Sequence, residues 1–436
     1  MPQILDAAQP DFDAAFAALL GAKREDSTDV DDIVARIIAD VRARGDAALI
    51  ELTERFDRLR LSADRLAFTA AEVDAEIAAV PPAERAALEL AAERIRAYHA
   101  RQMPEDQSWT DPEGATLGWR WTPVAAAGLY VPGGLASYPS SVLMNAIPAR
   151  VAGVERLAIA VPTPDGRVNP LVLLAARLAG VDEIYRIGGA QAIAALAYGT
   201  ETIPPVDKIT GPGNAFVAAA KRRVFGRVGI DMIAGPSEIL VVADADNDPD
   251  WLALDLLAQA EHDESAQSIL ITDDPALARA VAAAVAKRLE TLARRDIAAA
   301  SWRDFGAIIT VPDMTRAAEL ANRIAPEHLE LCVADADALS ERIRHAGAIF
   351  LGHWTPEAIG DYVGGPNHVL PTSRSARFSS GLSVMDFLKR TTLARMTPAS
   401  LAAIGPAAET LAVSESLEAH GLSVRARLDK LNEGER

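Results

Sequence analysis

Residues 155–189 read ERLAIAVPTPDGRVNPLVLLAARLAGVDEIYRIGG. Its short apolar runs, LAIAV and EIYR, have the length and side chains of strands, and they enclose the longer helical run NPLVLLAARLAG. Apolar strands that alternate with helices indicate βαβ units, in which a parallel sheet is buried on both faces. This stretch therefore predicts an α/β fold.

The same alternation continues along the chain. It runs on through AQAIAALAYG, DKIT, NAFVAAAKRRVF and GIDMIA, restarts at EILVVAD, and passes through SILIT, AIITV and LELCV to AIFLG at residue 352. We therefore expect two α/β units of similar size. From Pro371 onward the strand signal is lost, which predicts a small helical tail.

Residues 1–105 are expected to be mainly helical. Apolar residues recur at helical spacing from residue 29 to a stop signal at Gly45, and residues 27–29 offer a helix cap. A second helical run is interrupted at Pro81 and Pro82 and then resumes to about residue 103. No catalytic constellation is visible in this part of the sequence.

Composition limits the function. The 436 residues include 43 Lys plus Arg against 61 Asp plus Glu, a net charge of −18, and so acidic a surface disfavours nucleic acid and anionic lipid as partners. The long uncharged run 121–149 contains prolines and glycines throughout, so it is not expected to cross a membrane. The N-terminus lacks the pattern of a secretory signal, so we expect a cytoplasmic protein.

Cys332 is the single cysteine, which excludes an internal disulfide, and its apolar neighbours predict a buried side chain.

Glycine-rich loops follow several predicted strands. They are IGGAQ at 187–191, TGPGN at 210–214 and AGPS at 234–237. Open parallel sheets bind ligands at the carboxyl ends of their strands, and glycine lets the backbone approach a phosphate. Each loop alone is explained better by an ordinary tight turn than by a ligand site, but three in succession favour a nucleotide or another polar ligand. The sequence GPGNAF has two of the three glycines of the usual dinucleotide fingerprint, so any NAD site would be non-standard.

Two polar pairs are candidates for chemistry. Gln259 and His262 lie three residues apart, on one face of a predicted helix, where they can bind a metal or cap the helix end. Spacing alone favours capping and surface solvation over a metal site, because Gln is an uncommon zinc ligand. Glu327 precedes His328, which places a carboxylate beside an imidazole. Such a pair suits general acid–base catalysis, although an ion pair at a helix end explains it equally well.

Further polar residues lie toward the C-terminus. Asp361 and His368 occupy a glycine-dense loop that is too polar for a core. His420 follows Glu415 by five residues in the predicted tail, and we expect it to be exposed unless the tail docks on another surface. His99, His345 and His353 have no polar neighbours that suggest chemistry and are expected to be structural or solvated.

Longer runs of the sequence resemble the histidinol dehydrogenase family over nearly its full length. These runs cover residues 129–154, 187–203, 209–244, 256–272, 325–331, 347–372, 376–390 and 415–420. The sequence departs from the family pattern at PTSRSARF, residues 371–378, where many members carry glycines. No functional residue implied by the resemblance falls at that departure.

The resemblance implies a role for each matching residue. Glu327 and His328 match the catalytic pair, and Tyr130, Gln191 and Asn214 match positions that contact NAD. The implied ligands of one Zn²⁺ per subunit are Gln259, His262, Asp361 and His420. The implied substrate contacts are Ser237, Gln259, His262, His328, Asp361, Glu415 and His420.

The resemblance also implies an architecture. It predicts two Rossmann-like parallel-sheet domains with small helical extensions at both ends, in an intertwined homodimer with shared active sites. We expect an N-terminal extension over 1–26, a metal-binding catalytic domain over 27–129 and 238–381, an NAD-binding domain over 130–237, and a C-terminal helical tail over 382–436 that reaches the partner.

The implied reaction is the oxidation of L-histidinol to L-histidine through the aldehyde, with two NAD⁺. In this reaction His328 accepts a proton at each hydride transfer, Glu327 activates water, and zinc orients the substrate. Three other functions are weighed against it: a related dehydrogenase that oxidises another small polar alcohol, a zinc hydrolase that uses Glu327 and His328 without nicotinamide, and a non-catalytic ligand-binding protein.

Overall fold

The computed structural model describes residues 2–21, 28–132, 138–233 and 235–434. The chain divides into a first unit, Met1–Gln102 with Ala125–Phe387, and a second unit, Met103–Val124 with Leu388–Arg436. Residue 27 of the predicted cap, residues 133–137 of one family run and Ala234 of one glycine loop lie outside the described residues. No helix among the described residues is long and apolar enough to cross a membrane.

A five-stranded parallel sheet contains the two strands predicted within residues 155–189. Its strand order is β6 (Glu183–Tyr185), β5 (Arg156–Ala160), β4 (Ala126–Tyr130), β7 (Lys208–Thr210) and β8 (Gly229–Ile230). The predicted strands LAIAV, EIYR and DKIT lie here, and helices connect them, so the βαβ prediction is confirmed.

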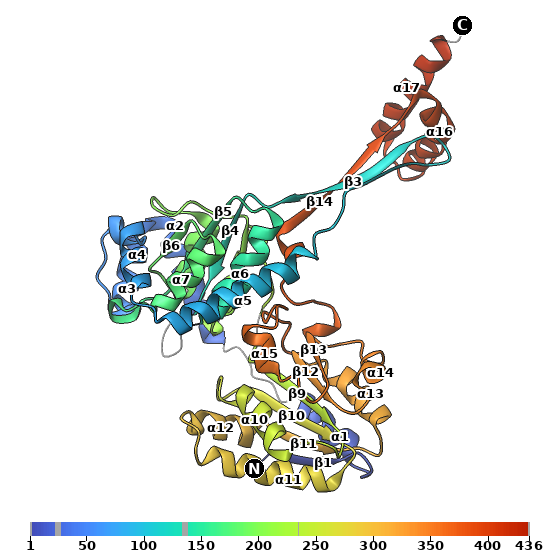
Figure 1. Ribbon diagram of the computed structural model, residues 1–436. Coiled ribbons are helices and arrows are strands. Elements are labelled where there is room, and N and C mark those ends of the chain that lie inside the picture. The colour runs from blue at the N-terminus through green and yellow to red at the C-terminus, as the bar shows by residue number, and fades with distance from the viewer. Residues whose placement is uncertain (1, 22–27, 133–137, 234, 435–436) are drawn as a thin grey trace. The chain divides into compact units, whose positions relative to one another are not determined.

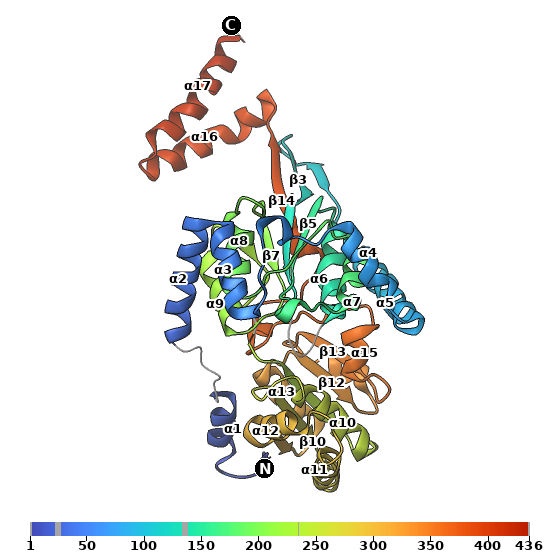
Figure 2. The ribbon, with the colours of Figure 1, turned by 90° about the vertical axis from the view of Figure 1, so that its left-hand side faces the viewer.

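Helices cover both faces of this sheet (Figure 2). One group is α2 (Thr28–Arg44), α3 (Asp46–Asp57), α8 (Gly189–Tyr198) and α9 (Ala215–Val224). The other is α4 (Ala70–Ala78), α5 (Pro82–Ala100), α6 (Pro139–Ala152) and α7 (Pro170–Ala179). The predicted helix end at Gly45 and the break at Pro81 and Pro82 are confirmed.

The N-terminal helices pack differently from the predicted domain division. That division joined 27–129 to the catalytic sheet, whereas the apolar stripe of α2, including Val34 and Val41, shares a core with Ile193 and Val217 on the five-stranded sheet. The helical periodicity of the sequence shows that one face of α2 is buried. It contains no information about which sheet buries that face, and this explains the difference.

A six-stranded parallel sheet forms the rest of the first unit. Its order is β1 (Gln3–Asp6), β11 (Ala307–Thr310), β10 (Gln267–Thr272), β9 (Glu238–Ala243), β12 (His328–Cys332) and β13 (Ala348–Leu351). The N-terminal extension thus supplies a strand as well as a helix, and Figure 1 shows β1 beside β11.

The faces of the six-stranded sheet carry two separate cores. One core includes α1 (Phe12–Gly21), α13 (Met314–Ile324) and α14 (Ala336–Ser340). The other includes α10 (Pro249–Ala260), α11 (Pro275–Leu289) and α12 (Arg295–Phe305). Cys332 lies in this second core, as predicted, and burial raises the pKa of its thiol. A sheet covered on both faces explains why its strands are continuous apolar runs.

The second unit contains a three-stranded antiparallel sheet and two helices. The strands are ordered β14 (Leu388–Arg395), β3 (Thr116–Pro123) and β2 (Gln107–Thr110), and the helices are α16 (Pro398–Ser414) and α17 (Glu418–Gly434). The prediction of an entirely helical tail is therefore wrong at β14. The sequence LKRTTLAR is polar and seven of its eight residues are exposed, so the strand is held by backbone pairing with β3 and shows no buried alternation.

Candidate active site

The candidate catalytic pair lies at the amino ends of two adjacent interior strands of the six-stranded sheet. Glu327 directly precedes β12, His328 is the first residue of β12, and Glu238 is the first residue of β9. The two strands are parallel and adjacent, with His328 opposite Ile239. This position differs from the carboxyl ends of strands, at which the glycine-rich loops are expected to bind a ligand.

The main chain of Glu238 orients both candidate catalytic side chains. Its amide donates to Glu327 Oε2 at 2.9 Å, and its carbonyl contacts His328 Nδ1 at 3.1 Å. The Glu238 side chain accepts a hydrogen bond from the Ser373 amide at 3.0 Å. Because a carbonyl can only accept, Nδ1 carries the proton and the lone pair of neutral His328 lies on Nε2.

Nε2 of His328 is available for proton transfer. It is buried and has no hydrogen-bond partner among the described residues, and its nearest carboxylate oxygen, Asp361 Oδ1, is 3.8 Å away. Burial lowers the pKa of His328 to about 4, with the Asp361 charge acting in the opposite direction. The imidazole is therefore neutral at physiological pH and can accept a proton.

Two buried carboxyl groups that the sequence analysis missed support His328. Glu357, the first residue of α15 (Glu357–Tyr362), has Oε1 3.2 Å from His328 Nδ1. Its amide donates to Glu330 Oε1 at 2.6 Å. Burial raises the pKa of both Glu357 and Glu330 well above the usual range. The available signal was Glu330 itself, a charged residue in the apolar strand LELCV.

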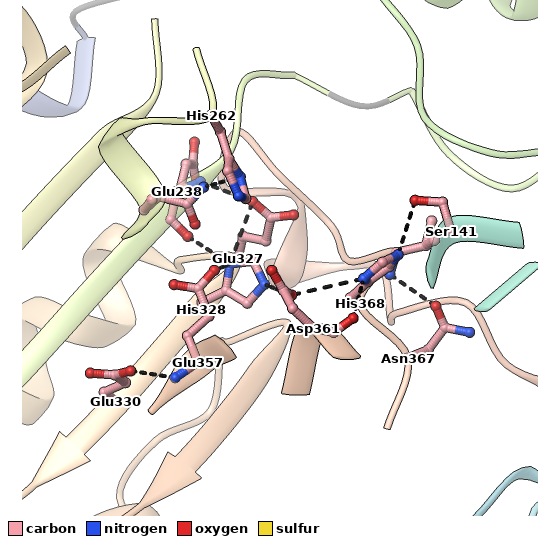
Figure 3. A network of polar contacts seen from close by, with 12 residues as sticks. Ser141, Glu238, His262, Glu327, His328, Glu330, Glu357, Asp361, Asn367 and His368 are labelled. Carbon is pink, nitrogen blue, oxygen red and sulfur yellow. Dashed lines mark hydrogen bonds and ion pairs between the residues drawn. The ribbon is translucent and has the colours of Figure 1, made fainter. Parts of the chain in front are cut away.

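The candidate metal ligands of the first unit lie around this pair. Gln259 lies in the last turn of α10, is fully buried, and its Nε2 is 3.1 Å from His262 Nδ1, so the predicted shared face is confirmed. Figure 3 shows His262 near the Glu327–His328 pair and Asp361 facing His328. Gln259 Oε1 is buried without a hydrogen-bond partner in the described chain. A buried amide oxygen left without a donor beside an imidazole suits a bound cation.

A second donor set shares Asp361. Ligand atoms of His328, Glu357 and Asp361 all lie within 4.8 Å of one another. His328 cannot use the Nε2 lone pair for a cation and for a substrate proton at the same time. In this second set His328 is a metal ligand. In the set with Gln259 and His262 its Nε2 stays available to accept a proton.

His368 links the candidate site to α6. Its Nδ1 contacts the Asp361 carbonyl at 2.9 Å and its Nε2 contacts Ser141 Oγ at 3.2 Å (Figure 3). The neighbouring Asn367 donates to the Met144 carbonyl at 2.6 Å. Burial lowers the pKa of His368. These contacts hold the glycine-dense loop against α6, a helix that packs on the five-stranded sheet.

The candidate NAD contacts lie at the carboxyl ends of strands in the five-stranded sheet. Tyr130 ends β4, and its hydroxyl accepts a hydrogen bond from the Gly189 amide at 3.0 Å. Burial raises the pKa of Tyr130 to about 12, so this hydroxyl stays protonated. Gln191 is buried in the first turn of α8, while Asn214 is exposed and its Oδ1 caps α9.

The remaining predicted site residues are Ser237, Glu415 and His420. Ser237 directly precedes β9 and is half-buried. Glu415 follows α16 and His420 lies in α17, so both belong to the second unit. Both are exposed, as was predicted for His420.

Comparisons with known proteins agree on one family. A family model described as histidinol dehydrogenase matches residues 21–428. The chain is 80% identical over 434 residues to "Histidinol dehydrogenase" of Cereibacter sphaeroides, with 100% of each chain covered. It is 68% identical over 431 residues to the protein of the same name from Rhodospirillum rubrum, with 99% of each covered. A crystal structure of histidinol dehydrogenase from Elizabethkingia anophelis superimposes with a TM-score of 0.94 at 36% identity, covering 99% of both chains.

Proposed function

Because the chain belongs to the histidinol dehydrogenase family, we propose that it oxidises L-histidinol to L-histidine through L-histidinaldehyde, reducing two NAD⁺. The observation that carries this proposal beyond the family is His328, whose Nδ1 is fixed by a carbonyl and whose Nε2 lone pair has no partner among the described residues. A neutral imidazole in that state is suited to accept the proton of an alcohol.

His328 serves as the general base in both oxidations. It accepts the hydroxyl proton of histidinol as hydride leaves the carbon for the nicotinamide, and it returns that proton to solvent before the second step. Its ring cannot rotate freely, because Nδ1 is held by the Glu238 carbonyl and lies 3.2 Å from Glu357 Oε1. This fixed orientation supports proton transfer at a single atom in each step.

Glu327 prepares the second oxidation by activating water. The Glu238 amide holds Oε2 at 2.9 Å, which fixes the plane of the carboxylate beside His328. Attack of water on the bound aldehyde gives a hydrated form, from which the second hydride departs. The oxidised cofactor must be renewed between the two steps.

Gln259, His262 and Asp361 would hold one Zn²⁺, with His420 of a second copy as the fourth ligand. The unpartnered Gln259 Oε1, buried among the described residues, supports this set, which leaves His328 Nε2 for the substrate proton. When bound, the ion would supply Lewis-acidic coordination for nitrogen atoms of the substrate. Tyr130, Gln191 and Asn214 would contact NAD⁺, and Ser237 and Glu415 would contact the substrate.

A homodimer with shared active sites accounts for the second unit. Its helices α16 and α17 expose large apolar side chains, among them Leu411 at 63%, Val413 at 64% and Leu422 at 58%. Apolar surface of this kind is typical of a subunit interface. We propose that this unit docks on a second copy and brings His420 and Glu415 to the partner's site.

The test is the yield of NADH per histidinol consumed, measured at limiting histidinol and excess NAD⁺ before and after chelation. Two equivalents, lost on chelation and restored by Zn²⁺, would support the complete proposal. One equivalent would mean that the aldehyde is released and that the role of Glu327 is wrong. None from folded, zinc-loaded protein would refute histidinol as substrate and favour another small polar alcohol.

Metal content separates the two donor sets. The proposed set predicts that His262→Asn loses zinc while Glu357→Gln retains it. Loss of zinc from Glu357→Gln with retention by His262→Asn would instead favour His328, Glu357 and Asp361 as ligands. In that case His328 would no longer be the base.

A further inference from the structure

The glycine loop 210–214 rests on a buried ion pair. Lys221, in α9, forms an ion pair through Nζ with Oδ1 of Asp231, the residue after β8. The two side chains are only 2% and 1% exposed. Removing two charges from water is costly, and ion pairs at this depth often contribute little net stability. Net stability alone therefore does not explain why these two charges are buried together.

Both members of the pair bind the same residue of the loop. Lys221 Nζ donates to the Gly211 carbonyl at 2.9 Å, and the Gly211 amide donates to Asp231 Oδ2 at 2.8 Å. Gly211 has φ +115°, and a Cβ placed there would lie 2.1 Å from the Tyr130 carbonyl oxygen. The pair thus holds Gly211 in a conformation that other residues rarely adopt, packed directly against the end of β4.

Gly211 lies close to two candidate NAD contacts, Tyr130 and Asn214. Gly211 lies against the main chain of Tyr130, and three residues later Asn214 begins α9 by accepting hydrogen bonds from the Phe216 and Val217 amides. Between them, Gly213 packs closely enough on Val217 that a Cβ would lie 2.4 Å from its side chain. A side chain at either glycine would therefore collide with its neighbours.

We propose that the Lys221–Asp231 pair is a positioning element for NAD⁺: it holds loop 210–214 in the conformation that presents Tyr130 and Asn214 to the dinucleotide. This inference rests on the proposed function. Neither charged group touches the cofactor in this arrangement, and both act through the main chain of Gly211. The pair should therefore affect cofactor binding and leave histidinol binding unchanged, because none of the proposed histidinol contacts lies in loop 210–214.

The test uses the double variant Lys221→Met with Asp231→Asn in the full-length, zinc-loaded enzyme. This variant removes both charges together, so no unpaired charge is left buried, and the amide oxygen introduced by Asp231→Asn can still accept from the Gly211 amide. We expect KM for NAD⁺ and the Kd for NADH, measured by fluorescence titration, to rise about tenfold, the factor that corresponds to one hydrogen bond. KM for histidinol should stay within about twofold.

Arg223→Met is the matched control, because Arg223 lies in the same helix and its ion pair with Asp31 is partly exposed. It should leave all three constants unchanged. If this double variant does not fold, Lys221→Leu with Asp231→Asn is measured in the same way, because it also leaves no unpaired charge buried. A native Kd for NADH in either folded variant, or equal losses for NADH and histidinol, would overturn the inference. The NADH titration needs no turnover, so a wild-type enzyme inactive on histidinol would refute the proposed function separately.

Discussion

His328→Asn is the substitution that tests the proposed base most directly. Asparagine carries its amide at nearly the position of the imidazole Nδ1, so its Nδ2 can still donate to the Glu238 carbonyl, now 3.1 Å from Nδ1. The atom that disappears is Nε2, which has no hydrogen-bond partner among the described residues. The variant therefore removes the proposed base and preserves its anchor.

The expected loss follows from these contacts. General-base catalysis contributes about 10²- to 10⁴-fold to a step, which corresponds to a barrier about 3 to 5 kcal/mol higher without it. The two oxidations share the base, but kcat follows the slower one, so the two losses do not multiply. The smaller side chain leaves a modest cavity, which should lower the free energy of unfolding by less than about 2 kcal/mol.

The assay compares kcat from NADH absorbance, zinc content and urea unfolding for three variants. His328→Gln is informative because it restores a polar group near the Nε2 position but loses the donor to Glu238, so it should be less stable than His328→Asn and equally inactive. His345→Asn is the control, since His345 donates to Asn322 through its main-chain amide, which the substitution retains. It should behave as wild type.

One result would refute the reasoning. If His328→Asn keeps kcat within about tenfold of wild type while its stability and zinc content are native, Nε2 is not the base. Loss of zinc in this variant would contradict the proposed division between metal ligands and base.

Three further outcomes are expected. His420→Asn should lose zinc and activity together, and mixing it with His328→Asn chains should restore partial activity through one intact shared site; no rescue in verified mixed dimers would argue for a single-chain site. Gly360→Ala would place a Cβ 2.4 Å from a ring carbon of Phe350, so α15 should shift and zinc content fall by elemental analysis, whereas native zinc would show that the ring yields. Arg186→Met removes three hydrogen bonds from the end of β6, two to the segment before α4 and one to Glu72 in α4. Urea unfolding should then show a loss of about 2 to 4 kcal/mol with zinc content unchanged.

Much of the fold could be predicted from the sequence because its strands are buried on both faces. Such strands are unbroken apolar runs, and SILIT and AIITV became β10 and β11 as expected. Strand β14 could not be found in this way, since its pairing with β3 leaves most of its side chains in solvent. Strand β1 was missed because four residues at the N-terminus give too short a pattern to identify.

The candidate site was predictable as a set of residues but not as an arrangement. The spacing of Gln259 and His262 fixed their shared face, because three residues make almost one helical turn. The part played by Glu238 could not be predicted, since its main chain, and not its side chain, orients Glu327 and His328. Nearly all residue types carry the same main-chain amide and carbonyl groups, so a sequence does not show which of these groups make such contacts.

The burial of Cys332 has a practical consequence for fluorescence work. The chain contains no other cysteine, and this thiol lies in the core with its pKa raised by burial. The thiolate is the nucleophile that attacks thiol-reactive dyes, so the native protein should resist labelling. A cysteine introduced at an exposed position of α17 would then be the only reactive one, and energy transfer between dyes on two copies could follow the exchange of subunits without removal of the native cysteine.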